Sequence, residues 1–337
     1  MKHFILAATF SVLCDSVASG QWRTQTIDTK SDLRGLCVVS PDVAWASGTG
    51  ARTRGPTTAA RPGRSEACPE RKSSTSAPSR RSGKRPPTCS AARPRRRLPH
   101  LQNDRRRHVL GRCSSCADPA AFFDAIAFWD EKNGIALGDP VKGQFQLLVT
   151  ADGGASWKPL PAKTLPPALP GEGAFAASGT CLVTHGEKYV WFATGGAKSA
   201  RAFRSRDRGL TWEVSETPVA AGAESAGIFS IAFRDKDHGV VVGGDYRKPN
   251  DVGATAATTS DGGKTWALID KRLPFRSAVA WAKDRWVAVG TSGSHASLDG
   301  GATWTPLDRE KYNSVGFTPT GEGWAVGPKG RIASFAK

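Results

Sequence analysis

"TSDGGKTW", residues 259–266, is one of four segments of the chain that share an eight-residue pattern. The other three are TADGGASW (150–157), SRDRGLTW (205–212) and SLDGGATW (297–304). Each reads Ser/Thr-x-Asp-x-Gly-x-x-Trp. An aspartate in a turn accepts hydrogen bonds from nearby backbone N–H groups, and a glycine supplies a left-handed backbone conformation. Internal repetition of one such unit predicts a repeat architecture.

A second pattern recurs around these segments. It consists of a short apolar strand, a polar turn and another apolar strand that ends in glycine, as in IAFWDEKNGIALGD (126–139) and IAFRDKDHGVVVGGD (231–245). One strand before each eight-residue segment and one beginning at its Trp complete a unit of four strands. Four antiparallel strands per repeat are typical of a β-propeller blade. We predict blades at 122–160, 177–216, 228–270, 275–308 and 313–337, with another beginning near residue 34.

The eight-residue pattern resembles the Asp-box, or bacterial neuraminidase repeat, which lies between the third and fourth strands of propeller blades. We expect the carboxylates to bind backbone N–H groups of their own turn, the glycines to be left-handed, and the tryptophans to pack between blades. The structural residues are then Asp152, Gly154, Trp157, Asp207, Gly209, Trp212, Asp261, Gly263, Trp266, Asp299, Gly301 and Trp304.

The predicted fold class is all-β: one propeller domain, residues 21–337, with seven four-stranded blades. The last predicted blade stops after RIASFAK (331–337), before a fourth strand. The segment QWRTQTI (21–27) has the Trp-led pattern of that strand. We expect the mature N-terminal strand to complete the last blade and close the ring, which removes an exposed sheet edge.

The positive charge of the chain is concentrated in one block. The whole chain has a formal net charge of +17, yet residues 51–112 hold 18 Lys and Arg against 3 Asp and Glu. All 11 Trp and all 14 Phe lie outside this block, so it cannot form a hydrophobic core. The basic charge is therefore no argument for a specific nucleic-acid partner.

We interpret residues 51–116 as a frame-shifted or disordered segment that replaces part of blades 1 and 2. Shifted reading frames of NDRRRHVLG (103–111) and GPTTAARPG (55–63) permit two more Asp-boxes, with aspartates near positions 105 and 58. Both positions fit the spacing of the other blades. The alternative is a genuine Arg-, Pro- and Ser-rich insertion that binds polyanions nonspecifically.

The first 20 residues have the pattern of a secretory signal peptide. An apolar run follows Lys2 and His3, and small residues precede a cleavage point after Ala18 or Gly20. We expect a secreted or periplasmic protein without a transmembrane segment. Cys113-x-x-Cys116 lacks a second pair or a histidine partner, so we expect no metal and no cofactor.

The candidate binding residues lie in loops that propeller geometry sends to the face opposite the Asp-boxes. They are Asp139, Glu172, Ser178, Glu224, Ser225, Asp245, Tyr246 and Lys248. Their acidic members favour a cationic or hydroxyl-rich partner. The alternative is that Asp139 and Asp245 cap their own turns and that Tyr246 is a rim aromatic.

The overall resemblance is to seven-bladed Asp-box propellers typified by the photosystem II stability and assembly factors. It implies a noncatalytic binding or assembly protein, monomeric, with an unknown protein or glycan ligand. The alternative is a glycoside hydrolase of the sialidase superfamily or another propeller enzyme, such as an oxidoreductase. Sialidases need an arginine triad and a tyrosine nucleophile, and this chain has three tyrosines and only LPFRSA (273–278) as an arginine motif. We therefore predict no catalytic residues.

Overall fold

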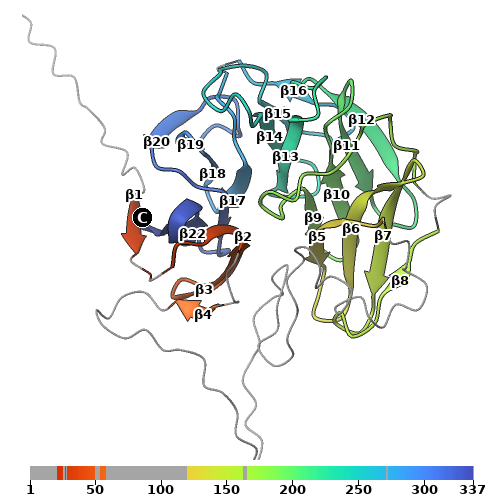
Figure 1. Cartoon of the computed structure of the whole chain (residues 1–337), viewed down its shortest axis with the longest axis horizontal. Helices are drawn as coiled ribbons and strands as arrows, with labels where there is room; N and C mark the ends of the chain where they lie inside the picture. Colours follow the sequence, from red (N-terminus) through yellow and green to blue (C-terminus); the bar gives the residue numbers. More distant parts are fainter. Residues whose placement is uncertain are drawn as a thin grey trace, which may run out of the picture.

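The computed structural model describes residues 21–25, 27, 29–49, 54–57, 120–161, 165–270 and 272–336. In these residues the chain forms strands β1 to β23 and one short 3-10 turn, η3 (Pro328–Gly330). The strands make six antiparallel sheets, five of four strands and one of three, arranged around a common axis (Figure 1). This is the β-propeller architecture that the repeats predict.

The sheets are blades, numbered 1 to 6 by the order of their innermost strands along the chain. Blade 1 contains β2 (Asp32–Ser40), β3 (Val43–Thr49) and β4 (Arg54–Thr57). Blade 2 contains β5 (Phe123–Phe128), β6 (Gly134–Val141), β7 (Gln144–Thr150) and β8 (Lys158–Pro159). Blade 3 contains β9 (Leu182–His185), β10 (Tyr189–Ala193), β11 (Ala200–Ser205) and β12 (Glu213–Thr217).

The remaining blades follow the same order. Blade 4 contains β13 (Ala226–Phe233), β14 (Gly239–Asp245), β15 (Ala256–Thr259) and β16 (Ala267–Leu268). Blade 5 contains β17 (Ala278–Ala282), β18 (Arg285–Gly290), β19 (Gly293–Ser297) and β20 (Thr305–Asp308). Blade 6 contains β21 (Ser314–Phe317), β22 (Gly323–Val326), β23 (Ile332–Ala336) and β1 (Gln21–Gln25).

The first strand of each blade lies innermost. Contacts join β5 to β9, β9 to β13, β13 to β17, β17 to β21 and β21 to β2. A chain of buried hydroxyls links several of these strands: Thr180 Oγ1 donates to Ser230 Oγ at 2.7 Å, and Ser230 Oγ accepts from Val279 N at 3.0 Å. Ser314 Oγ reaches the Ser178 carbonyl at 3.3 Å. Hydrogen bonds between blades therefore join the strands nearest the axis.

The N-terminal strand completes blade 6, as the Trp-led pattern predicts. β1 pairs antiparallel with β23, with Trp22 opposite Phe335 and Gln25 opposite Ile332. The Trp22 ring contacts Phe335 edge-on, with centroids 4.9 Å apart. Blade 6 thus gains its fourth strand from the opposite end of the chain.

The hydrophobic core lies mainly between blades. Five clusters of buried side chains each join two consecutive blades, from blades 2 and 3 through to blades 6 and 1. A sixth cluster, around Phe123, Leu148 and Trp157, lies within blade 2. Blades 3 to 6 bury both faces against described neighbours, so their strands carry apolar residues on both sides, as in the fully buried β13.

The four Asp-box-like segments form nearly identical box turns after β7, β11, β15 and β19. In the turn of blade 4, Thr259 Oγ1 donates to Asp261 Oδ1 at 2.8 Å and accepts from Gly263 N at 2.9 Å, while Thr265 donates to both carboxylate oxygens. The glycines at the fifth position of the four segments, Gly154, Gly209, Gly263 and Gly301, have φ between 85° and 101°. The predicted local roles of aspartate and glycine are confirmed.

The tryptophans of the box turns pack as predicted in three blades. Trp212, Trp266 and Trp304 belong to clusters that join their blade to the preceding one. Trp157 differs, because its cluster contains only residues of blade 2 and the segment just before it.

Residues 51–116, which we interpret as a frame-shifted or disordered segment in place of part of blades 1 and 2, include one described strand. Arg54–Thr57 forms β4, which pairs with β3 as the third strand of blade 1. Pairing there needs only backbone groups, so the composition of the segment does not prevent it.

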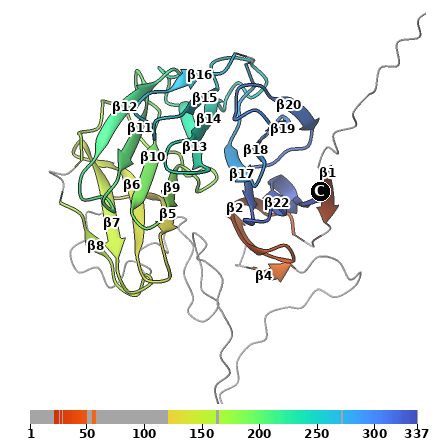
Figure 2. The same ribbon diagram turned by 180° about the vertical axis from the view of Figure 1, so that it is seen from behind.

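Blades 1 and 2 are the two ends of the described series (Figure 2). The predicted seventh blade, the frame-shifted boxes, the Cys113–Cys116 pair and the signal peptide lie outside the described residues.

Candidate functional site

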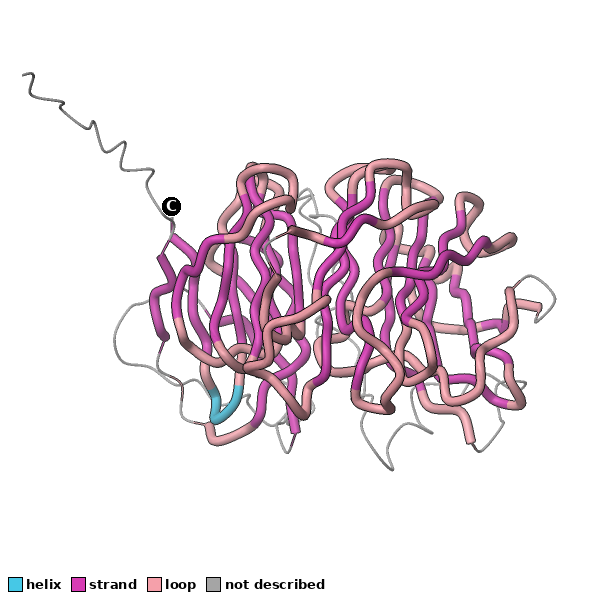
Figure 3. Tube along the Cα trace, turned by 90° about the horizontal axis from the view of Figure 1, so that it is seen from above, coloured by secondary structure: helices cyan, strands magenta, loops and turns pink. Residues whose placement is uncertain are grey.

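The strands run between two layers of loops (Figure 3). The box turns form one of these layers. Each box turn follows the third strand of its blade, and that strand ends beside the start of the second strand, as the pairing of Thr259 with Gly239 shows. The other layer, called the loop face here, holds the loops that follow the second strand of each blade. All eight predicted binding residues belong to segments at or near the loop face, but the structure uses them differently.

Glu172 is a buried structural residue. It is 6% exposed, and its carboxylate accepts hydrogen bonds from Arg201 Nε at 2.8 Å, Thr194 Oγ1 at 2.5 Å and Leu169 N at 2.7 Å. Arg201 also forms an ion pair with it through Nη2. A buried carboxylate with this many donors is satisfied within the protein and offers no free oxygen to a ligand.

Asp139, near the end of β6, fastens a loop to blade 2. Its Oδ1 accepts a hydrogen bond from Ala174 N at 2.9 Å, and burial raises the pKa of its carboxyl above the usual value, although the Ala174 bond opposes the shift. A Cβ atom on Gly173 would lie 2.9 Å from Asp139 Oδ1, so a larger residue there would displace the carboxylate. Asp139 therefore binds the loop of the next blade rather than capping its own turn.

Ser178 and Ser225 are buried too. Ser178 is 3% exposed and belongs to the hydroxyl chain near the axis, with its Oγ 2.6 Å from Thr180 Oγ1. Ser225 is 1% exposed, and its hydroxyl is hydrogen-bonded to Asp245. Both hydroxyls therefore serve contacts within the protein.

Asp245 caps its own turn, which is the alternative weighed for it. Its Oδ1 accepts from Arg247 N at 2.9 Å. The Ser225 hydroxyl and this backbone bond, with the nearby charges of Lys248 and Arg247, hold the pKa of Asp245 below its usual value. The cap fixes the turn that presents Tyr246.

Tyr246 is the exposed aromatic of the loop face. Its residue is 48% exposed, and its ring meets the buried Phe229 edge-on, with centroids 6.0 Å apart. Phe229 in turn stacks on Phe175 at 3.9 Å and contacts Phe275 at 4.8 Å. This set of four rings, called the Tyr246 platform here, draws on three interblade or hairpin loops and on β13.

The charges around the platform are basic. Arg247 lies over the Tyr246 ring at 5.9 Å, and Lys248 follows it; both side chains are exposed. Glu224 is also exposed, on the loop before β13. The sequence argument for a cationic partner rested on four acids, but Glu172 is neutralised by Arg201, Asp139 is half-buried, and Asp245 is engaged in its turn. At the Tyr246 platform the expectation of a cationic or hydroxyl-rich partner therefore loses most of the acidic groups on which it rested.

The structure thus brings Ser225, Asp245 and Tyr246 together. Glu224 and Lys248 are exposed nearby. The other three predicted residues make internal contacts: Asp139, Glu172 and Ser178. The sequence argument missed the three phenylalanines of the platform. A signal existed for Phe175, because it is the only aromatic residue in the Gly- and Ala-rich loop GEGAFAASG (171–179). Phe229 and Phe275 lie in apolar segments and carry no such mark.

The described residues contain no candidate metal cluster and no candidate membrane-spanning helix. No group of three or more His, Cys, Asp or Glu side chains there is placed to hold a metal ion. No helix in the described part of the chain is long and apolar enough to cross a bilayer.

The chain is a β-propeller that resembles Asp-box propellers. Among solved structures, YCF48 bound to a D1 peptide covers 94% of this chain with 97% of its own, at 14% identity and a TM-score of 0.42. YCF48 from Cyanidioschyzon merolae gives the same identity and TM-score. The GH74 xyloglucanase of Xanthomonas campestris covers 93% of this chain at 12% identity and a TM-score of 0.44, and the match spans 53% of that enzyme.

Sequence comparison adds no relative. No protein-family model matches the chain, and no curated protein matches it.

Proposed function

We propose that this protein is an exported, noncatalytic propeller that binds an extended segment of a partner protein on the Tyr246 platform. The proposal rests on one contrast. Acidic side chains of the loop face are engaged in internal contacts, whereas a half-exposed tyrosine packs on buried phenylalanine rings. Glu172 and Asp245 are held by internal hydrogen bonds, whereas Tyr246 contacts Phe229 through its ring and is 48% exposed.

Such a platform suits binding rather than reaction. A tyrosine that is already oriented loses little conformational entropy on binding, and tyrosine is enriched among the residues that dominate binding energy. Arg247 and Lys248 stand beside the ring, so the segment that fits is one with an apolar side chain next to a carboxylate. Binding by a rigid scaffold with short loops is a common use of the propeller fold.

The test is a selection of short random peptides on the purified full chain, followed by affinity measurements on the best binder. Tyr246→Ala should weaken binding about 30-fold, which corresponds to a hot-spot loss of about 2 kcal/mol. Leu298→Ala is the matched control, because Leu298 is 57% exposed on the box-turn layer. It should leave the affinity unchanged.

Two results would contradict the proposal. One is a selected peptide that binds Tyr246→Ala as tightly as the parent protein. The other is turnover of sialyl or other glycosides that Tyr246→Phe abolishes, which would favour the glycoside hydrolase alternative.

A further inference from the structure

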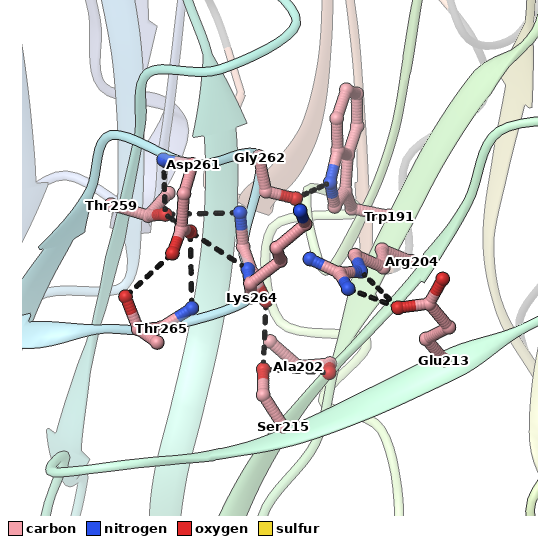
Figure 4. Close-up of polar contacts among 11 residues, drawn as sticks. Trp191, Ala202, Arg204, Glu213, Ser215, Thr259, Asp261, Gly262, Lys264 and Thr265 are labelled. Atoms are coloured by element: carbon pink, nitrogen blue, oxygen red, sulfur yellow. Dashed lines mark hydrogen bonds and ion pairs between the residues drawn. The ribbon is translucent and has the colours of Figure 1, made fainter.

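The boundary between blades 3 and 4 is filled by large side chains (Figure 4). Trp191, Arg204 and Glu213 stand opposite one another on β10, β11 and β12. Trp191 Nε1 donates to the Gly262 carbonyl of the next box turn at 2.9 Å, and Arg204 pairs with Glu213. The box turn of blade 4 therefore packs on blade 3 with the space between them occupied.

The equivalent positions in blade 4 carry small side chains. The pairing register puts Val240, Thr258 and Ala267 opposite one another on β14, β15 and β16, in the places of Trp191, Arg204 and Glu213. The box turn of blade 5 packs there in the same way, since a Cβ atom on Gly301 would lie 2.8 Å from Thr258 Cγ2 and 3.1 Å from Val240 Cγ2. In blade 3 the Trp191 indole binds the Gly262 carbonyl, and the corresponding carbonyl in the box turn of blade 5 is that of Gly300. Val240, in the place of Trp191, has no polar side-chain atom to bind it.

The result is a cavity of about 330 Å³ at the boundary of blades 4 and 5, called the seam cavity here. Small ligand sites begin at about this volume. The hairpin between β13 and β14, two box turns and two strands of blade 4 supply its lining. The lining residues are Arg234, His238, Thr258, Thr259, Ser260, Thr265, Ala267, Asp299 and Gly300.

The lining offers polar groups that the fold has not used. The hydroxyls of Thr258 and Ser260 make no hydrogen bond to another residue in the described part of the chain. Arg234 uses Nε for Asp235, at 3.3 Å, which leaves its two terminal nitrogens as donors. His238 uses Nδ1 for Asp235, at 3.0 Å, and its Nε2 takes no part in that contact. The lining therefore offers both donors and acceptors to a ligand.

The lining holds both positive and negative groups. Arg234 and His238 share the carboxylate of Asp235, and Asp299 contributes a further negative charge whose oxygens already accept from Ser297 and Thr303. An anion would gain little from this set, and an apolar ligand would leave the hydroxyls unpaired. Groups that both donate and accept, such as the hydroxyls of a sugar ring, match the lining.

We propose that the seam cavity binds one ring of a neutral carbohydrate. The site lies on the box-turn layer, apart from the Tyr246 platform, and goes beyond the function proposed above. A hexose has about 12 non-hydrogen atoms, and the usual efficiency per atom gives a Kd of about 2 mM. Such affinity is useful when several sugar units or several copies of a site act together.

The experiment titrates the full chain with glucose, galactose, mannose and N-acetylglucosamine, detected by saturation-transfer NMR on the sugar protons. At least one of these sugars should show saturable transfer. The variant Thr258→Arg with Ala267→Glu recreates the Arg204–Glu213 pair in blade 4 and fills the cavity. Because blade 3 already carries that pair, the variant should fold and should weaken sugar binding at least tenfold.

Controls separate this site from the Tyr246 platform. Tyr246→Ala should leave sugar binding unchanged, and the filled variant should leave peptide binding unchanged. Ser260→Ala removes one hydroxyl and should weaken sugar binding about fivefold, a typical effect of one neutral hydrogen bond. The proposal is overturned if none of the sugars transfers at ten times the expected Kd. It also fails if inorganic phosphate binds instead, or if the filled variant binds sugar as well as the parent.

Discussion

Trp22 in β1 donates a hydrogen bond from its indole Nε1 to Ser294 Oγ in β19 over 3.1 Å, although 272 residues separate the two along the chain. Ser294 Oγ in turn donates to Asp308 Oδ1 at 2.7 Å. The same indole contacts Tyr312, with ring centroids 5.3 Å apart. The N-terminal strand thus completes blade 6 and is also bound to blade 5.

Trp22→Ala should destabilise the protein by about 3 kcal/mol, because it removes an aromatic ring from a packed cluster together with a hydrogen bond. Urea unfolding followed by circular dichroism measures this loss. Trp22→Phe keeps a ring in the cluster and should lose less. An unchanged free energy of unfolding in Trp22→Ala would show that β1 contributes nothing to the stability of blade 6.

Glu172→Gln should destabilise the protein by about 3 to 5 kcal/mol, because it leaves the buried Arg201 guanidinium without its carboxylate. Thermal unfolding of the single variant and of Glu172→Leu with Arg201→Met measures the effect. The double variant should recover most of the loss, since two apolar side chains leave no buried charge unpaired. A loss below about 1 kcal/mol in the single variant would contradict a structural role for Glu172.

Asp139→Asn should raise the melting temperature at pH 7 and leave it unchanged at pH 3. Burial raises the pKa of Asp139 in the folded state, so the stability that its protonated form contributes is lost as pH rises through that pKa. An asparagine Oδ1 still accepts the hydrogen bond from Ala174 N and carries no charge. Calorimetry at the two pH values tests this. A lower melting temperature at pH 7 would mean that the fold needs the charge.

The box turns should make the protein acid-sensitive. Hydrogen bonds from Ser156 lower the pKa of Asp152 to about 2. Burial opposes such a shift at Asp261 and Asp299, but the hydrogen bonds from Thr265 to Asp261 and from Thr303 to Asp299 outweigh it. The pKa of each of these two carboxyls is also lowered to about 2. Unfolded aspartates titrate near about 3.9. The stability from these depressed pKa values is therefore present above about pH 4 and lost as pH falls towards 2.

Urea unfolding at a series of pH values measures this loss. Asp261→Asn removes one of the titrating groups, so its free energy of unfolding should fall less steeply with acid than that of the parent. A free energy that stays constant down to pH 3 in the parent protein would contradict the role of these carboxylates.

Sequencing the gene across codons 51–116 tests the frame-shift interpretation. We expect a corrected reading to contain two further Ser/Thr-x-Asp-x-Gly-x-x-Trp segments near positions 58 and 105. It should also lower the net charge, since 18 of the 47 basic residues lie in residues 51–112. A sequence that keeps the present frame throughout would leave the genuine insertion as the remaining account.

The box turns and blade limits could be predicted because their causes are local. In blade 3, Ser205, Asp207 and Thr211 bind one another within seven residues, so the pattern alone contains the interaction. Period-two alternation and glycine positions then give the strands, and predicted blade 4, 228–270, agrees with strands over 226–268.

The candidate site could not be predicted to the same extent, because its contacts join distant loops. The pairing of Glu172 with Arg201 spans 29 residues, and that of Asp139 with Ala174 spans 35. Whether an acid on a loop faces solvent or a neighbouring blade depends on loop packing, which periodicity does not encode. Asp245 was the simpler case, because its cap is formed by the second residue after it.

The pairing of β1 with β23 also constrains how the protein is made. During synthesis β1 leaves the ribosome with the first residues, but its partner strand follows only after five other blades have been translated. Until then Trp22 and the edge of β1 have no partner in blade 6, so a chaperone or an unpaired strand of another chain competes for them. Blade 6 is therefore completed only by bringing together two strands from opposite ends of the sequence, and a contact between such distant segments forms slowly.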